Sequence, residues 1–242
     1  MSAVQLQYRR RDGGEAVLTS LEDASAAAIV AGSPVRTPPS HRGHRHYPGL
    51  FWSSTTKGHV VYESLLELDR LWLADFDPHV VGIATQPLHL SDRDGSTLRR
   101  HVPDILLGLS DGGFTLVDVK PSALLDRPEV AAQFAWTARL CHAKGWRYEV
   151  FSGGDTTTLR NVRYLAAGRR PGSWAERDVA LVRAALGPED TWRDVEQRAV
   201  AAGVPSERVR LVMQSLLWSG QWRIDMSAPL GAGSRITKQV PA

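Results

Sequence analysis

The sequence predicts a mixed α/β domain followed by a smaller domain of three helices and a β-hairpin. In the first part, short apolar runs of strand length accompany two stretches with helical periodicity, at 60–76 and 128–144. After a basic, breaker-rich segment at 168–173, three helix-start signals follow one another. We therefore expect a flexible basic N-terminal arm, a first domain and a second domain, at residues 1–40, 41–170 and 171–242.

Two apolar runs, one around Asp104 and one around Asp118, flank an Asp-Gly-Gly turn signal at 111–113 and predict a β-hairpin. The second glycine favours a three-residue loop, 111–113, closed by a glycine bulge. With that loop Asp104 lies opposite Lys120. Because side chains alternate along a strand, Asp104, Asp118 and Lys120 then share one face. A two-residue loop would instead turn the two acids to opposite faces.

Two carboxylates and an amine at one end of a sheet suit a metal-dependent phosphodiesterase. Mg²⁺ is usually held by one or two carboxylates with waters and substrate phosphate, so Asp104, Asp118 and the Val119 carbonyl are candidate ligands. Lys120 would stand beside the metal, where an ammonium orients the attacking water or stabilises charge on the phosphate. The alternative is that these are ordinary solvated residues at the end of a strand.

A third carboxylate is expected from the predicted helix at 60–76. Glu63 lies in its first turn, from which it could lean over the sheet end and complete the metal site. Glu67 and Arg70 share a helix face with Glu63, and we expect both to be solvated. For Glu63 the same solvated alternative stays open.

These residues resemble the PD-(D/E)XK nuclease superfamily, and more narrowly the TnsA-like endonuclease subunits of heteromeric transposases. The resemblance covers roughly residues 40–168. The runs that carry it are Tyr62-Glu63-Ser64, Leu73-Ala74-Asp75-Phe76-Asp77-Pro78, Gln86-Pro87, His101-Val102-Pro103-Asp104 and Val117-Asp118-Val119-Lys120-Pro121. One departure is Asp118, which stands where the wider superfamily more often has Glu.

The resemblance implies a restriction-endonuclease-like fold, in which helices flank a mixed sheet, and a Mg²⁺-dependent DNA endonuclease for which Mn²⁺ can substitute. Such a subunit cuts the non-transferred strand at transposon ends. Its partners would be that DNA, a DDE-type transposase subunit and an AAA+ ATPase regulator. The expected catalytic residues are Glu63, Asp104, Asp118 and Lys120. The expected metal ligands are Glu63, Asp104, Asp118 and Val119.

Two other functions stay open. One is a stand-alone PD-(D/E)XK nuclease used in repair or defence, which would cut without any partner protein. The other is a non-catalytic adaptor that binds DNA or protein and would not bind metal. The intact set of acids and lysine argues against the adaptor.

Composition agrees with a nuclease without deciding the matter. The net charge of +3 permits nucleic-acid binding, and the single cysteine, Cys141, excludes an internal disulfide and a cysteine-based zinc finger. No apolar stretch approaches transmembrane length and the N-terminus lacks a signal-peptide core, so we expect a cytoplasmic protein.

Basic residues gather near the predicted site, where they would contact DNA phosphates. Arg42, Arg45 and Lys57 all precede the predicted helix at 60–76, and Lys57 stands just before its start. Arg99 and Arg100 lead directly into the first acid-bearing run.

The second domain is expected to be a winged helix-turn-helix. Its predicted helices and strands lie at 174–186, 192–202, 205–218, 221–225 and 234–238. Arg208 and Arg210 of the third helix could enter a major groove, but the rest of that helix is largely apolar. Winged helices also dock proteins, and TnsA-like C-terminal domains are expected to contact the ATPase regulator. We favour protein docking for this domain.

Overall fold

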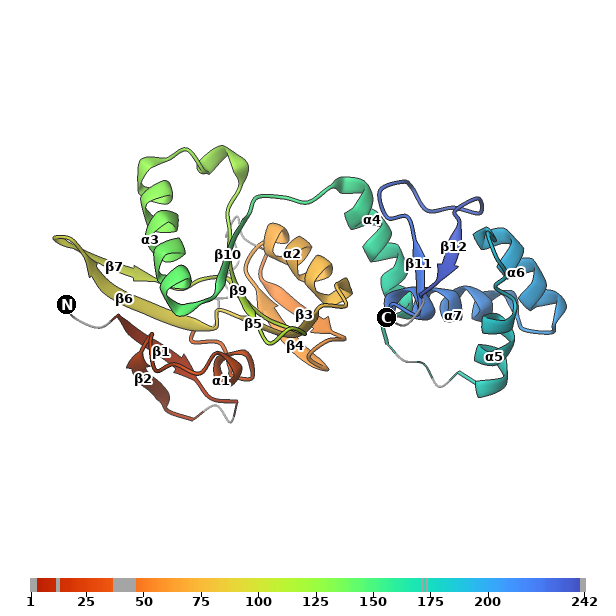
Figure 1. Ribbon diagram of the computed structural model, residues 1–242, viewed down its shortest axis with the longest axis horizontal. Helices are drawn as coiled ribbons and strands as arrows, with labels where there is room; N and C mark the ends of the chain where they lie inside the picture. Colours follow the sequence, from red (N-terminus) through yellow and green to blue (C-terminus); the bar gives the residue numbers. More distant parts are fainter. Residues whose placement is uncertain (1–3, 12–13, 37–46, 171, 173, 240–242) are drawn as a thin grey trace. The chain divides into compact units, whose positions relative to one another are not determined.

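The computed structural model describes residues 4–11, 14–36, 47–170, 172 and 174–239. The chain divides into two compact units, 1–153 and 154–242, whose elements are labelled in Figure 1. Within the described ranges, none of the helices combines the length and the apolar character that crossing a bilayer requires.

The first unit is built on two four-stranded sheets. One has the order β2-β1-β6-β7 and is antiparallel throughout. Its strands are β1 (Gln5–Arg9), β2 (Ala16–Ser20), β6 (Leu88–Asp94) and β7 (Thr97–His101). The other has the order β10-β9-β8-β5, in which β10 runs parallel to β9 and the remaining pairs are antiparallel. Its strands are β5 (Val80–Thr85), β8 (Ile105–Leu109), β9 (Phe114–Val119) and β10 (Arg147–Phe151).

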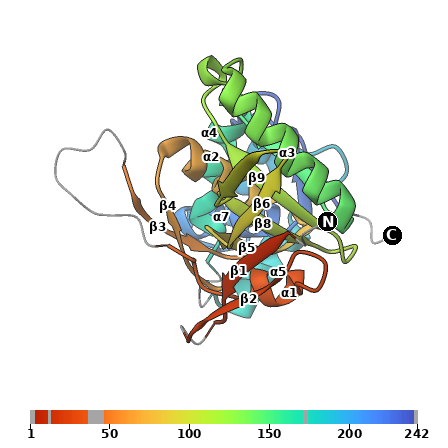
Figure 2. The ribbon, with the colours of Figure 1, turned by 90° about the vertical axis from the view of Figure 1, so that its left-hand side faces the viewer.

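The second of these sheets buries both of its faces, because its strands send apolar side chains to either side. Leu106 and Leu116 enter a core shared with the first sheet, α1 (Ala26–Val30) and α3 (Pro128–Lys144). Ile105 and Val117 enter a core shared with α2 (Leu65–Phe76) and the hairpin of β3 (Gly49–Ser53) and β4 (Gly58–Tyr62). Figure 2 shows α3 and α2 with the sheet strands between them. A helix on each side of a mixed sheet is consistent with the fold that the sequence predicts.

The N-terminal segment differs from the flexible arm that we expected over 1–40. Residues 5–9, 16–20 and 26–30 form β1, β2 and α1. Leu6 and Ile29 are almost completely buried in the first core. The basic cluster at 9–11 is typical of an arm, but β1, which ends in it, alternates exposed and buried residues as in a sheet with one face in solvent.

The predicted β-hairpin is confirmed, but its register differs from the expected one. Leu109 and Gly113 close a loop of 110–112, and Gly112 takes the left-handed conformation with φ +80°. The loop is thus displaced by one residue from the expected 111–113. Ile105 pairs with Val117, so the register sets Asp104 opposite Asp118 rather than opposite Lys120. The two-residue displacement preserves the alternation of the paired residues at 105–108 and 114–117.

The second unit contains the three helices and the two strands expected for it, preceded by one more helix. They are α4 (Thr156–Leu165), α5 (Glu176–Ala184), α6 (Trp192–Ala201), α7 (Ser206–Trp218), β11 (Trp222–Ile224) and β12 (Ile236–Lys238). Short 3₁₀ turns lie at Ser122–Leu124 in the first unit and at Ala166–Gly168 here. The interpretation of this unit as a winged helix-turn-helix stays a prediction.

The division between the units falls after Gly153, earlier than the expected 170/171. The reason is α4, which packs with the second unit. The side-chain amide of the buried Asn161 donates to the carbonyls of Met226 and Ala228, at 3.1 and 2.8 Å. These bonds tie α4 to the segment that joins β11 to β12.

Candidate active site

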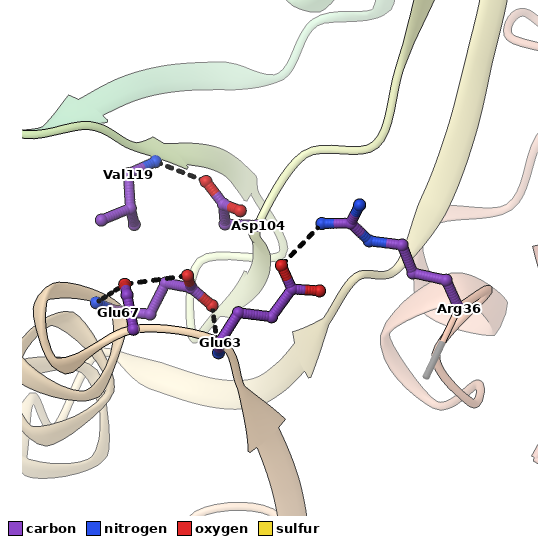
Figure 3. A network of polar contacts seen from close by, with 6 residues as sticks. Arg36, Glu63, Glu67, Asp104 and Val119 are labelled. Atoms are coloured by element: carbon purple, nitrogen blue, oxygen red, sulfur yellow. Dashed lines mark hydrogen bonds and ion pairs between the residues drawn. The ribbon is translucent and has the colours of Figure 1, made fainter. Parts of the chain in front are cut away.

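Asp104 stands directly before β8, where backbone hydrogen bonds from two other strands hold it. Its N–H donates to the carbonyl of Val117, and its carbonyl accepts from the N–H of Gln86 just after β5. Its carboxylate accepts a 2.6 Å hydrogen bond from the N–H of Val119 at the end of β9. The carboxylate is therefore fixed at the edge where β8 and β9 meet (Figure 3).

Glu67 of α2 is brought to the same place by the cap of its helix. Ser64 is the N-cap, and its Oγ accepts from the N–H of Glu67 and donates to Glu67 Oε1. The other oxygen, Oε2, accepts from the N–H of Glu63 at 2.9 Å. These three hydrogen bonds turn the carboxylate back toward the helix start, beside Asp104 (Figure 3).

Glu67 therefore differs from the solvated residue that we expected, since it is only 7% exposed. Arg70 differs too: it forms two 2.8 Å hydrogen bonds to Glu149 of β10, and its side chain is 13% exposed. The signal for Glu67 was present in the sequence, because Ser64 followed three residues later by Glu67 is a capping-box pattern.

The electrostatics of this place disfavour two negative charges. Burial raises the pKa of Asp104 to about 8; the hydrogen bond from Val119 opposes this rise, while the neighbouring carboxylates of Glu67 and Asp118 add to it. Burial also raises the pKa of Glu67. Two carboxylates that resist ionisation together are stabilised in their charged forms by a cation, and their oxygens are what a hard divalent ion prefers. The donor set fits Mg²⁺ or Mn²⁺.

Glu63, the predicted third carboxylate, lies at the edge of this cluster. Its carboxylate pairs with Arg36 at 3.0 Å, and about a quarter of its side chain is exposed. Figure 3 shows its carboxylate turned toward Arg36. Of the two carboxylates, that of Glu67 in α2 thus lies closer to Asp104 (Figure 3). Glu63 precedes the N-cap Ser64 and lies beside Glu67.

Asp118 belongs to a separate buried cluster on the α3 side of the sheet. Its side chain accepts a 2.6 Å hydrogen bond from Tyr148 Oη and lies 2.7 Å from His101 Nε2. Asp118 is 1% exposed. The structure therefore does not gather Asp104 and Asp118 as a ready ligand set. No group of three or more potential metal-ligating side chains of His, Cys, Asp and Glu is found in the described part of the chain.

Lys120 and Val119 complete the predicted residues of the hairpin. Lys120 follows β9 and is half-buried, and its N–H donates to the carbonyl of Phe151. Val119 meets Asp104 through its N–H, whereas we expected its carbonyl to serve as a ligand. Both residues adjoin the end of the sheet at which Asp104 stands.

Gln86 is a further candidate, which we noted in the sequence only as part of a run. It is completely buried and has a positive φ of 42°. Neither polar atom of its side-chain amide has a hydrogen-bond partner among the described residues. Buried amides are nearly always paired, so this one, whose backbone bonds to Asp104, marks a place suited to a polar ligand.

The predicted DNA-binding residues have varied environments. Arg42 and Arg45 lie outside the described residues. Lys57 is exposed in the turn between β3 and β4. Arg99 is paired with Asp94 at 2.7 Å, whereas Arg100 is exposed.

In the second unit, Arg208 and Arg210 of α7 are both paired with carboxylates. Arg208 meets Asp178 of α5 at 2.5 Å, and Arg210 meets Glu196 of α6 at 2.7 Å. These ion pairs partly neutralise the two arginines and link α7 to α5 and to α6.

Residues 77–153 match a family model described as TnsA-like endonuclease N terminal. The matched region holds Asp104, Asp118 and Lys120, whereas Glu63 and Glu67 precede it. No curated protein matches the chain. The match confirms the resemblance that the sequence carries over this region.

Proposed function

We propose, on the premise that residues 77–153 form a TnsA-like endonuclease domain, that this protein is the subunit of a heteromeric transposase that cuts the non-transferred DNA strand at transposon ends. The observation that carries the proposal is that Glu67 lies beside Asp104 at the edge of the sheet where β8 begins and β9 ends. The family match alone would not say which side chains of this protein carry out the cleavage.

Each residue of this place has a role in phosphodiester hydrolysis. Asp104 and Glu67 would hold a divalent cation, with Glu63 and Asp118 as further candidate ligands. Mg²⁺ or Mn²⁺, when bound, supplies Lewis-acid polarisation of the phosphate and a water of lowered pKa. The Lys120 ammonium stabilises negative charge on the phosphate or orients the attacking water. The Val119 N–H keeps the Asp104 carboxylate at the sheet end.

The second unit would dock the other subunits rather than read DNA. The ion pairs of Arg208 and Arg210 with carboxylates of α5 and α6 support this choice, because a charge already paired has less to gain from phosphate. We propose that this unit is a winged helix-turn-helix that contacts an AAA+ ATPase regulator, while a DDE-type transposase cuts the other strand.

A reconstituted cleavage assay tests the proposal. The full chain is incubated with Mg²⁺ or Mn²⁺, a plasmid that carries transposon ends, and a candidate DDE-type transposase and AAA+ ATPase. We expect cutting by the wild type and by the control variants Asp126→Ala and Lys144→Ala. We expect none by Asp104→Ala or Lys120→Ala, with the far-UV circular dichroism of all variants unchanged.

The outcomes separate the open alternatives. If Asp104→Ala or Lys120→Ala cuts DNA as well as the wild type does, the assignment of the active site is wrong. Cutting by the wild-type chain without partners would favour a stand-alone nuclease. Calorimetric titration with Mn²⁺ identifies the third case, because an adaptor would neither bind the ion nor cut in the complete mixture.

A further inference from the structure

The first sheet of the first unit has one buried face and one face open to solvent. Leu6 and Tyr8 of β1 point into the core, and Leu88 and Leu90 of β6 do the same. Because side chains alternate along a strand, the residues between them project from the opposite face, which we call the outer sheet face. The strand residues of this face are Gln5, Gln7, Arg9, Ala16, Leu18, Ser20, His89, Ser91, Arg93, Leu98 and Arg100.

The charges of this sheet are sorted between its two faces. Arg9, Arg93 and Arg100 are exposed on the outer sheet face. Both acids of the strands, Asp92 and Asp94, have the inward parity. Asp94 is there paired with Arg99 at 2.7 Å and Arg139 at 2.9 Å. The described strand residues of the outer sheet face thus include three arginines and no carboxylate.

The remaining side chains of the outer sheet face are suited to phosphate contact. Gln5, Gln7 and Ser91 are neutral donors, and the register sets Ser91 between Gln5 and Arg100. With His89 and Leu18 they line a shallow hollow of about 240 Å³. Burial, with the nearby Arg100 charge, lowers the pKa of His89, so at neutral pH the imidazole contributes hydrogen bonding rather than charge.

The dimensions of this face match a stretch of duplex. Residues two apart on a strand are separated by about 6.8 Å, and from the row of Arg9 to the row of Arg93 there are three such steps, or about 20 Å. A DNA duplex rises by about 3.4 Å per base pair, so the face spans roughly six base pairs. β7 ends at His101, three residues before Asp104. The chain therefore runs from this sheet straight into the candidate active site.

We propose that the outer sheet face binds the sugar–phosphate backbone of the DNA duplex that flanks the cleaved bond. This inference rests on the proposed nuclease function and adds the surface that holds its substrate. Arginine, glutamine and serine side chains bind phosphate oxygens, and such contacts carry no sequence information. The contacts therefore supply affinity and register on the duplex, and they are the same for any DNA sequence.

Salt-dependent DNA binding by the full chain tests this surface. Fluorescence anisotropy of a labelled random duplex of about 20 bp is recorded in EDTA between about 50 and 200 mM salt. The test variant is Arg9→Ala/Arg93→Ala/Arg100→Ala. Its matched control is Arg127→Ala/Arg160→Ala/Arg177→Ala, which removes the same charge from exposed arginines outside the outer sheet face.

We expect the test variant to lose at least about tenfold in affinity at physiological salt and to reduce the salt slope by about two to three, since each lost phosphate contact removes about 0.9. The loss should be equal for a transposon-end duplex. The control variant should keep the wild-type slope. Equal salt slopes for wild type and test variant would overturn the proposal. They would favour contact of these arginines with an acidic protein partner instead.

Cleavage by the wild type in the reconstituted mixture separates this inference from the proposed function. If the wild type cuts DNA and the test variant binds DNA with the affinity of the wild type, only the proposed role of the outer sheet face is wrong. If the wild type binds DNA through this face but never cuts, the nuclease proposal fails while the binding surface stands. Absence of any DNA binding by the wild type would overturn the surface directly.

Discussion

Tyr148 and Asp118 are joined by a 2.6 Å hydrogen bond in which the half-buried phenol donates to the buried carboxylate. His101 lies 2.7 Å from the other carboxylate oxygen. The pair links β10 to β9 on the α3 side of the sheet, one residue before Val119. It thereby helps to fix the strand end at which Asp104 stands.

Removing this donor should cost stability. Tyr148→Phe leaves one oxygen of a buried carboxylate without its partner, and we expect the free energy of unfolding to fall by about 1–3 kcal/mol. Urea unfolding followed by fluorescence measures the change. Tyr47→Phe is the control, because Tyr47 is 68% exposed and its variant should unfold like the wild type. Equal midpoints for both variants would mean that the hydrogen bond contributes nothing.

Asp104→Asn should stabilise the metal-free protein and abolish cleavage. The raised pKa of Asp104, about 8 against 3.8, means that ionising it costs free energy in the folded state. Below about pH 4 the acid is protonated in both states, so the variant has no advantage there. The advantage grows as the pH rises toward 8, where we expect about 2 kcal/mol after discounting for partial exposure. Urea unfolding in EDTA at several pH values gives the measurement, and a pH-independent difference would contradict this origin.

Glu67 should matter more than Glu63 for metal binding. Glu67→Gln keeps the capping-box acceptor but removes the charge beside Asp104, and we expect Mn²⁺ affinity to fall at least about tenfold in calorimetry. Glu63→Gln frees Arg36 from its ion pair at the edge of the cluster and should reduce the affinity less. The reverse order would assign the third carboxylate to Glu63, as the sequence first indicated.

Asp75 should be a structural residue despite its place in a run shared with nucleases. It is 5% exposed and accepts hydrogen bonds at 2.7–3.0 Å from Ser53 Oγ, from the N–H and Oγ of Ser54 and from the N–H of Thr55. Asp75→Ala leaves these donors unpaired after β3, so we expect a loss of about 2–4 kcal/mol in unfolding free energy. Asp77→Ala, at an exposed position, is the comparison. Thermal melts decide, and a midpoint equal to that of Asp77→Ala would contradict the role.

Local patterns were enough to predict the parts of the fold that depend on neighbours in sequence. The helix at 128–144 was predicted to the residue. Two of the three pairings of the first sheet, β1 with β2 and β6 with β7, are local hairpins. The third pairing, β1 with β6, is long-range and sets Leu6 opposite Leu90. The polar and apolar residues at 5–8 alternate as in a strand, but neither hairpin sequence specifies the long-range pairing that joins the two into one sheet.

The candidate site was predictable in its residue types but less so in its geometry. Pro103-Asp104 and Lys120 identify the hairpin, and the match to an endonuclease family agrees with them. The register was not fixed by sequence, because Gly112 and Gly113 both suit the left-handed position of the loop. The burial of Glu67 depends on the packing of α2 against the sheet, which periodicity alone does not supply.

The hairpin loop at 110–112 has an evolutionary consequence. One inserted or deleted residue there would reverse the facing of every later residue of β9 relative to β8, exchanging Asp118 with Val117 across the sheet. Substitutions that keep a left-handed residue at Gly112 would leave the facing intact. We therefore expect proteins descended from this one to vary the residues of the loop other than Gly112, while the length of the loop stays constant.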